Sequence, residues 1–210
     1  MSTVIDLPGV PFVLTPSAVD AWRVDDVGVV VATAPGHTDL FVDPGGEHTV
    51  GAESMLNAVT LLGDPPAGDF QLSARVGVDF VARFDAGVLL VWLDETHWAK
   101  LCFEQSPSGA PMVVSVVTRG TSDDANGFVV EGEQVWLRIS RIGRVHAFHA
   151  SLDGQVWELV RVFALGQGSD GVTGHRLGLE VQAPTGDGCT ATFAQVRFTP
   201  TTLGDLRDGS

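Results

Sequence analysis

The side chains with the greatest chemical potential fall on alternate positions of the run from His97 to Gln105. The intervening positions are apolar, so a strand here would bury one set and turn the other away from the core. An aromatic ring beside an ammonium and a carboxylate suits a polar ligand with an apolar face, and sugars are the obvious class. The residues of this outward set are Trp98, Lys100, Cys102 and Glu104.

The same row also has an interpretation that needs no ligand. Trp98 would pack beneath a loop while Lys100 and Glu104 form a solvated ion pair. Exposed pairs of that kind are common and contribute roughly 0–1 kcal/mol. From the strand alone, this structural interpretation is the one favoured.

Signatures of catalysis are absent from the sequence. It contains no G-x-S-x-G elbow, no P-loop, no dinucleotide fingerprint and no E-x-D-x-x-E run of the kind found in β-sandwich glycosidases. Retaining glycoside hydrolysis needs two carboxyl groups about 5 Å apart, and Glu104 has no second carboxylate on its own strand. If Glu104 is an acid or base, its partner comes from elsewhere, and the candidates are Asp39, Asp85, Asp123 and Asp124.

A cluster of oxygen-bearing side chains follows the run that ends at Arg119. Asp123, Asp124 and Asn126 could hold Ca²⁺, which takes six to eight oxygen ligands. Asp and Asn are also the commonest turn residues, because they bond to their own backbone and tolerate positive φ. The turn interpretation of Ser122 to Asn126 is favoured, and no cofactor is expected beyond this calcium alternative.

Two histidines and one short motif are expected to be structural. His146 and His149 lie three apart, so a strand places them on opposite faces, where they cannot share one metal ion. His149 is expected to be partly buried with its hydrogen bonds satisfied. The segment Ser151-x-Asp153-Gly154-x-x-Trp157 looks like an Asp-box hairpin, in which the Asp holds the turn.

The elements that position these residues are short strands separated by turns. Glycine and proline recur between runs rich in Val, Leu, Phe and Trp, and the alternation is that of half-buried strands. The strands expected most clearly are 70–80, 97–105, 112–119, 145–151 and 156–163, with a three-strand meander over 87–119. A bulge near Ala194 and Gln195 would bring Phe193 and Phe198 to the same face. A type I′ turn at Asp153-Gly154 would join the strands 145–151 and 156–163.

The length and composition predict one all-β domain, a two-sheet antiparallel jelly-roll sandwich over 1–210. Its core is expected at about 10–200, with 201–210 as a surface tail. The chain has 210 residues, 26 acidic and 12 basic, and a formal net charge of −14. Nucleic acid and anionic membrane surfaces are disfavoured as partners, because both need a cationic footprint. With no visible signal peptide and only Cys102 and Cys189, we expect a cytoplasmic protein with reduced cysteines.

The order of several motifs resembles the domain of unknown function 1349 family over about residues 20–200. The resemblance is carried by Asp85-Ala86-Gly87, Trp98 to Glu104, Val114 to Thr118, Ser122 to Asn126, Leu137-Arg138, the Asp-box segment, Arg161, Gly188-Cys189 and Phe193. It implies a fold similar to concanavalin A-like lectins and glucanases and to the C-terminal sandwich of some β-xylosidases. The family has no established reaction, so the resemblance implies no activity.

Three functions remain open at this stage. The first is noncatalytic binding of a carbohydrate or sugar-like ligand on a concave sheet; the second is a glycoside hydrolase or lyase with Glu104 as acid or base. The third is a cytoplasmic protein-interaction module, for example a homodimer. The residues expected to form the ligand site are Asp39, Asp85, Trp98, Lys100, Glu104, Thr118, Asp123, Asp124, Asn126, Arg138, His149 and Arg161.

Overall fold

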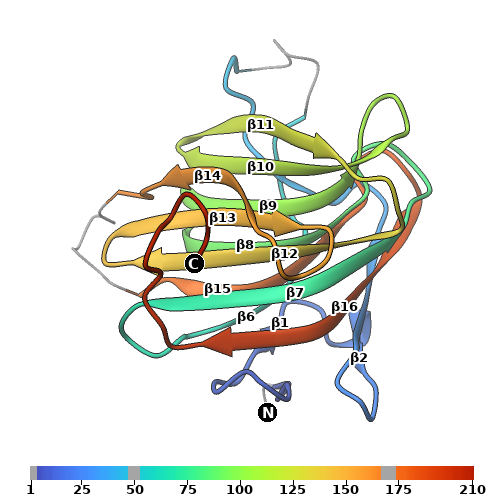
Figure 1. The fold of residues 1–210 in the computed structure, drawn as a ribbon. Helices are drawn as coiled ribbons and strands as arrows, with labels where there is room; N and C mark the ends of the chain where they lie inside the picture. The colour runs from blue at the N-terminus through green and yellow to red at the C-terminus, as the bar shows by residue number, and fades with distance from the viewer. Residues whose placement is uncertain (1–3, 47–52, 167–173) are drawn as a thin grey trace.

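The computed structural model describes residues 4–46, 53–166 and 174–210, and its regular structure is almost entirely β (Figure 1). Two seven-stranded antiparallel sheets form a sandwich, as the alternation of apolar residues predicts. One 3-10 turn, η1 at Val19–Ala21, precedes the first strand of the second sheet. Within the described residues, no helix is long and apolar enough to cross a membrane.

The first sheet has the strand order β1-β6-β15-β8-β9-β10-β11. Its strands are β1 (Thr15–Pro16), β6 (Val59–Gly63), β15 (Arg176–Gln182), β8 (Ala86–Asp94), β9 (His97–Gln105), β10 (Pro111–Arg119) and β11 (Thr121–Val129). A separate two-stranded sheet consists of β4 (Leu40–Phe41) and β5 (Met55–Leu56).

The second sheet has the strand order β14-β13-β12-β7-β16-β3-β2. Its strands are β14 (Glu158–Phe163), β13 (Val145–Ser151), β12 (Gln134–Ile142), β7 (Phe70–Asp79), β16 (Gly188–Thr199), β3 (Val30–Pro35) and β2 (Trp22–Val24).

The core lies between the two sheets and is built from the inward residues of each strand. On β9, Leu101 and Phe103 are fully buried in the same cluster as Val76 of β7. Gly87 of β8 lets the sheets approach closely, because a Cβ atom there would lie 2.7 Å from Cγ1 of Val76. Every residue of the outward row of β9 therefore faces away from this core.

The strand containing that row is confirmed with the expected ends. β9 covers His97–Gln105 and pairs with β8 on one side and β10 on the other, which confirms the meander. Lys100 lies opposite Leu90 of β8 and Val116 of β10.

The bulge expected in the closing strand is also confirmed. The register of β16 against β7 shifts between Ala194 and Arg197, and Gln195 has φ of 54°. The shift allows Phe193 and Phe198 both to be buried in the core.

Two sequence-based expectations about turns are wrong. Ser122 to Asn126 is not a turn but part of β11, the last strand of its sheet, where one side of the strand is free to carry polar residues. The hairpin between β13 and β14 is present, but Asp153-Gly154 is not a type I′ turn, because only Gly154 has positive φ. Asp153 Oδ1 instead accepts hydrogen bonds from the backbone of Gln155 and Val156, so β14 begins at Glu158.

Candidate functional site

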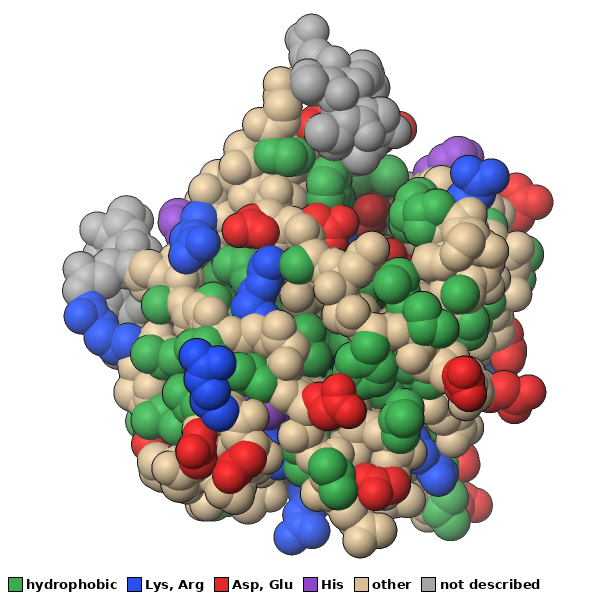
Figure 2. All heavy atoms as spheres, turned by 45° about the horizontal axis from the view of Figure 1, so that its top comes forward, with side chains coloured by type: hydrophobic (Ala, Val, Ile, Leu, Met, Phe, Trp, Pro, Cys, Tyr) green, Lys and Arg blue, Asp and Glu red, His purple; other side chains and the backbone are tan. Residues whose placement is uncertain are grey.

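A cavity of about 800 Å³ opens over the outer face of the first sheet. Residues 37–46 and 53–58, which include β4 and β5, lie over β9 there, and we call them the covering segment. One part of its wall is apolar and includes Phe41, Met55 and Phe84. Figure 2, which turns the top of Figure 1 forward, shows several acidic side chains close together near the top of the molecule. The charged and amide side chains that line the cavity are Asp39, Glu53, Lys100, Glu104, Asp124 and Gln182.

The centre of the cavity floor is a buried ion pair. Lys100 is 2% exposed, and its Nζ donates to Asp39 Oδ1 at 2.7 Å and to Gln182 Oε1 at 2.7 Å. Burial lowers the pKa of Lys100, but the carboxylates of Asp39 and Glu180 outweigh it and hold that pKa above its usual range. Lys100 therefore stays an ammonium and cannot serve as a nucleophile or base.

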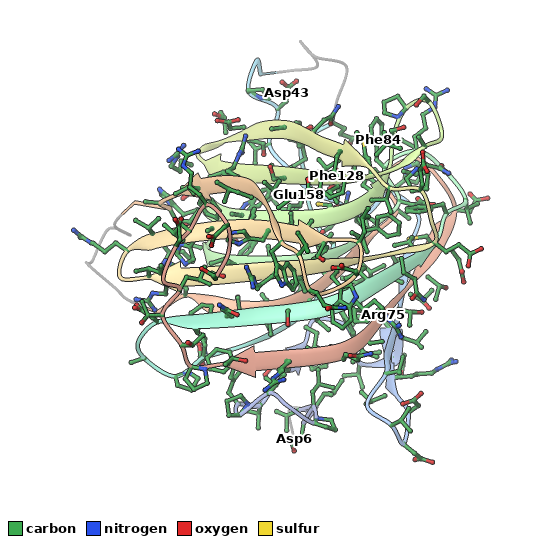
Figure 3. The ribbon with its side chains drawn as sticks, in the orientation of Figure 1. Asp6, Asp43, Arg75, Phe84, Phe128 and Glu158 are labelled. Carbon is green, nitrogen blue, oxygen red and sulfur yellow. The ribbon has the colours of Figure 1, made fainter. Side chains whose placement is uncertain are left out.

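Gln182 has its amide oriented by two partners. Its Oε1 accepts from Lys100, while its Nε2 donates to the backbone oxygen of Phe84 at 3.1 Å. Phe84, labelled in Figure 3, has φ of 68° and lies in the turn before β8. The amide thus connects the ion pair to a strained part of the cavity wall.

Backbone strain is concentrated at this cavity. Among the described non-glycine residues, only His37, Phe84 and Gln195 have positive φ, and the first two line the cavity. Such conformations cost of order 1–3 kcal/mol each and cluster at functional sites. The strain makes this cavity a candidate site on grounds independent of its charges.

Two carboxyl groups beside the ion pair are kept protonated. Glu104 is 8% exposed, and burial raises its pKa to about 8 despite the opposing effect of Lys100. Glu180 is fully buried, and burial raises its pKa to about 8 as well. Desolvation also raises the pKa of Asp124, which lies at the wall formed by β11. At neutral pH the cavity therefore holds one carboxyl group, that of Glu104, which can donate as well as accept hydrogen bonds.

The covering segment is held in place by side chains of the sheet and by its own backbone. Val42 donates its N–H to Ser122 Oγ at 2.9 Å, and Ser122 also contacts Thr118 Oγ1 at 2.9 Å. Asn57 Oδ1 accepts from the N–H of Asp39 at 3.0 Å, which fixes the backbone that presents the Asp39 carboxylate. Thr118, a predicted site residue, therefore supports the cavity without lining it.

Trp98 has a structural position. It is fully buried beside Leu40, Ala58 and Val116, under the covering segment, and it is not one of the residues that line the cavity. The packing alternative thus describes Trp98 correctly. The ion pair expected between Lys100 and Glu104 is wrong, because Lys100 pairs with Asp39 and the pair is buried.

Several other predicted residues lie outside the cavity. Asp85 is buried, and its Oδ2 accepts from the N–H groups of Val81 and Ala82, so it holds the turn before β8. Asn126 is exposed on β11. Asp123 points away from Asp124 on the same strand and pairs with Arg161 of β14 at 3.1 Å, which links the two sheets at one edge.

The expectation that Arg138 lies in the same ligand site as Lys100 is wrong, and Trp136 of the same strand does not reach that site either. Both residues lie on β12, in the opposite sheet, and their side chains point to its outer face. His149 of β13 lies directly opposite Arg138 on the same face. Only Asp39, Lys100, Glu104 and Asp124 of the predicted set line the cavity.

The sequence reasoning missed Gln182 and His37, which line the cavity, and Glu180, which lies beside its ion pair. Glu180 and Gln182 alternate with Leu179 and Val181 on β15, and this period of two could have placed both on an outer face. No comparable signal exists for His37, which reaches the cavity through an irregular segment.

Metal ligation finds no support in the described parts of the chain. Among residues 4–46, 53–166 and 174–210, no three His, Cys, Asp or Glu side chains are grouped as ligands of one ion. Cys102 and Cys189 are free and buried.

The comparisons with known proteins agree with the fold and leave the ligand open. A family model described as "Protein of unknown function (DUF1349)" matches residues 17–201. The curated protein "Regulation of enolase protein 1" of Saccharomyces cerevisiae is 30% identical over 102 residues, which are 48% of this chain and 51% of that protein. This chain thus matches about half the length of that relative.

Two solved structures show the same sandwich. A functionally unknown protein from Saccharomyces cerevisiae superposes with a TM-score of 0.72 at 23% identity, covering 89% of this chain and 100% of that chain. The GH43 BlXynB protein from Bacillus licheniformis superposes with a TM-score of 0.71 at 15% identity, covering 94% of this chain and 38% of that chain. At these identities the likeness concerns the fold alone.

Proposed function

Since this chain belongs to the DUF1349 family of proteins of unknown function, we propose that it is a noncatalytic module that binds an uncharged carbohydrate in the cavity over β9. The observation that carries the proposal is the cavity of about 800 Å³, in which polar groups such as Lys100 and Glu104 face an apolar wall. A cavity of this size and lining is typical of small-molecule sites, where a few fixed polar groups set the orientation of the ligand.

The charges of the cavity argue for an uncharged ligand. Its lining carries four carboxyl groups, on Asp39, Glu53, Glu104 and Asp124, against the single ammonium of Lys100. Two of the three N–H donors of that ammonium already bond to Asp39 and Gln182, and the Asp39 carboxylate offsets its charge. Hydroxyl groups can donate to carboxylates and accept from protonated carboxyls, whereas a sugar acid or a phosphate would be repelled.

The fold of the structural relatives supports a carbohydrate by analogy. The GH43 BlXynB protein shares the sandwich, and another solved structure with this fold is a GH43 glycoside hydrolase. Analogy of fold is a weak guide to function by itself, so the weight rests on the lining of the cavity.

A thermal-shift screen tests this proposal. The purified protein is screened against neutral oligosaccharides, sugar acids and Ca²⁺, together with the variants Glu104→Gln and Asp124→Asn. A ligand at a hundred times its Kd stabilises by about 2.7 kcal/mol, which is a shift of several degrees. We expect a neutral sugar to shift the melting temperature of the wild type and to lose that shift in both variants.

The matched control is Glu158→Gln, which changes an exposed carboxylate on the opposite sheet (Figure 3). It should keep the full shift. A shift by sugar acids that equals the shift by neutral sugars would contradict the charge argument. No shift with any sugar would move the weight to the interaction module, with a search for a protein partner as the next step.

A glycoside hydrolase is the second candidate, and one observation favours it. Burial raises the pKa of Glu104 to about 8, so at neutral pH it is a protonated acid in the same cavity as Asp124. Glycosidases place two carboxyl groups on either side of the scissile bond, and one of the two is a protonated acid. Release of reducing sugar by the wild type, lost in Glu104→Gln, would replace the binding module with the enzyme.

A further inference from the structure

The last part of the chain covers a second group of polar side chains, on the outer face of the opposite sheet. Figure 1 shows the dark red end of the chain folded back across β12 and β13. In this segment, residues 203–210, the backbone oxygen of Gly209 accepts from Arg138 Nη2 at 2.7 Å, and that of Leu206 accepts from His149 Nε2 at 2.8 Å. Leu203 and Gly209 are buried there.

Arg138 is an unusual residue beneath this cover. It is 5% exposed, and no carboxylate of the described residues lies within ion-pair distance of its guanidinium. Of its five donors, Nη2 bonds to Gly209, while Nε is buried without a hydrogen-bond partner in the described parts of the chain. Burial without a counter-charge lowers the pKa of Arg138 to about 10.

Trp157 fixes the orientation of the Arg138 guanidinium, and a neighbouring hydroxyl also lacks a hydrogen-bond partner among the described residues. The guanidinium lies over the ring of Trp157 at 4.1 Å, an arrangement that fixes its plane. Ser140, two positions along β12, has a buried hydroxyl that also lacks a partner among the described residues. A guanidinium in a fixed plane with free donors is the geometry that carboxylates and phosphates bind.

The charge of this face differs from that of the cavity over β9. Arg75 of β7, labelled in Figure 3, lies beside Trp136, with its guanidinium 6.0 Å from the centre of that ring. Arg197 of β16 lies opposite Ser73, which itself lies opposite Arg138. Three arginines thus share one sheet face in a chain with only 12 basic residues, which favours an anionic ligand here.

We propose that the outer face of the second sheet holds a second ligand site, for an oxyanion, and that residues 203–210 cover it reversibly. The backbone oxygen of Gly209 occupies one donor of Arg138, where an oxygen of the anion would bind. The anion competes with the segment, so the apparent affinity of the covered protein is lower than that of the site itself.

Two glycines of the segment provide a matched pair of variants. Gly209 has φ of 76°, which strains any residue with a Cβ atom, and that atom would collide with Nη2 of Arg138 and lie 3.1 Å from Cβ of Trp157, so Gly209→Ala should displace the segment. At Gly204 a Cβ atom would meet only Ser210 O, at 3.6 Å, so Gly204→Ala should leave the segment in place.

The experiment titrates inorganic phosphate and acetate separately into the two variants and the wild type at constant ionic strength. The readout is the NMR signal of the Arg138 Nε–H group, identified by its absence in Arg138→Gln. We expect Gly209→Ala to bind one of the anions roughly tenfold or more tightly than Gly204→Ala and the wild type. The two anions distinguish a carboxylate ligand from a phosphate ligand.

A deletion of residues 203–210 is the second variant, with the fold checked by circular dichroism. A folded Gly209→Ala or deletion variant without a saturable change at Arg138 would overturn the proposal, as would equal affinities in Gly209→Ala and Gly204→Ala. If neither the deletion nor Gly209→Ala folds, the segment is an inseparable part of the sandwich and the proposal also fails.

Discussion

Asp39 supplies the counter-charge to the buried ammonium at the cavity floor. Its carboxylate neutralises the Lys100 ammonium, which is 2% exposed, at 2.7 Å. Removing one partner of a buried ion pair typically costs 3–5 kcal/mol, because the remaining charge is left uncompensated. We expect Asp39→Asn to lower the free energy of unfolding by about that amount in guanidinium denaturation.

The control for this variant is an exposed ion pair in the same protein. Asp123→Asn breaks the bond to Arg161, in which the aspartate side chain is 65% exposed, and should cost at most about 1 kcal/mol. Equal effects of the two substitutions would show that the Lys100 pair is solvated and the cavity floor is not rigid.

Glu180 provides a pH-dependent prediction at the same scale. Both of its carboxyl oxygens are buried without a hydrogen-bond partner among the described residues, and burial raises its pKa from 4.5 to about 8. Between pH 4.5 and 8 the folded state holds a proton that the unfolded state has lost, so stability falls as pH rises. Glu180→Gln should remove roughly 4–5 kcal/mol of this fall, since the pKa rises by about 3.5 units and each unit is about 1.4 kcal/mol.

The measurement is the free energy of unfolding at pH 5 and at pH 8.5 for the wild type, Glu180→Gln and Glu131→Gln. Glu131 is exposed, so its variant should follow the wild type. A parallel pH dependence of all three proteins would mean that Glu180 is ionised in the folded state.

The β10–β11 hairpin is the element that holds the cover of the cavity. Ser122 Oγ accepts the N–H of Val42, a contact between residues 80 positions apart. Ser122→Ala should destabilise the protein by about 1–2 kcal/mol, because the amide of Val42 loses its partner. Hydrogen exchange at the Val42 amide should accelerate roughly tenfold, and binding in the cavity should weaken although Ser122 carries no charge.

Thr121→Ala is the control, since Thr121 precedes Ser122 in β11 and is exposed. It should leave the exchange of Val42 unchanged. An unchanged Val42 amide in Ser122→Ala would show that other contacts hold the covering segment.

Some strands of this protein could be predicted from its sequence, and others could not. β9 was predicted to the residue because its alternation of seven consecutive side chains, from Trp98 to Glu104, has only one explanation. β11 was missed because Asp and Asn favour turns in general, and only its place at the sheet edge explains them in a strand. The short β4 and β5 contain two residues each and leave no periodic signal.

The cavity itself could be predicted only in part. The alternation along β9 identified Lys100 and Glu104 as outward-facing site residues, because alternation depends only on neighbours in sequence. The partners of Lys100 are 61 and 82 positions away, at Asp39 and Gln182, and such contacts follow from topology rather than from any local pattern. The sequence therefore indicated which side chains face outward, but not that a covering segment buries them.

At the scale of the whole molecule, the sandwich separates two surfaces of opposite charge. The acidic cavity lies on the outer face of the first sheet, and Arg138 lies on the outer face of the second. Both sheets and the core between them intervene, and packed sheets are about 10 Å apart. Effects at sites this far apart, with no shared partners, add within about 0.3–0.5 kcal/mol.

This separation predicts that the two surfaces act independently. In the double variant Asp124→Asn/Arg138→Gln, the change in unfolding free energy should equal the sum of the single changes within about 0.5 kcal/mol. A sugar that stabilises the wild type should stabilise Arg138→Gln equally. By contrast, Asp39→Asn and Glu104→Gln should not be additive, because both carboxyls interact with Lys100. Coupling above 1 kcal/mol between the opposite faces would mean that the core transmits a change from one sheet to the other, and that the cover formed by residues 203–210 responds to the state of the cavity.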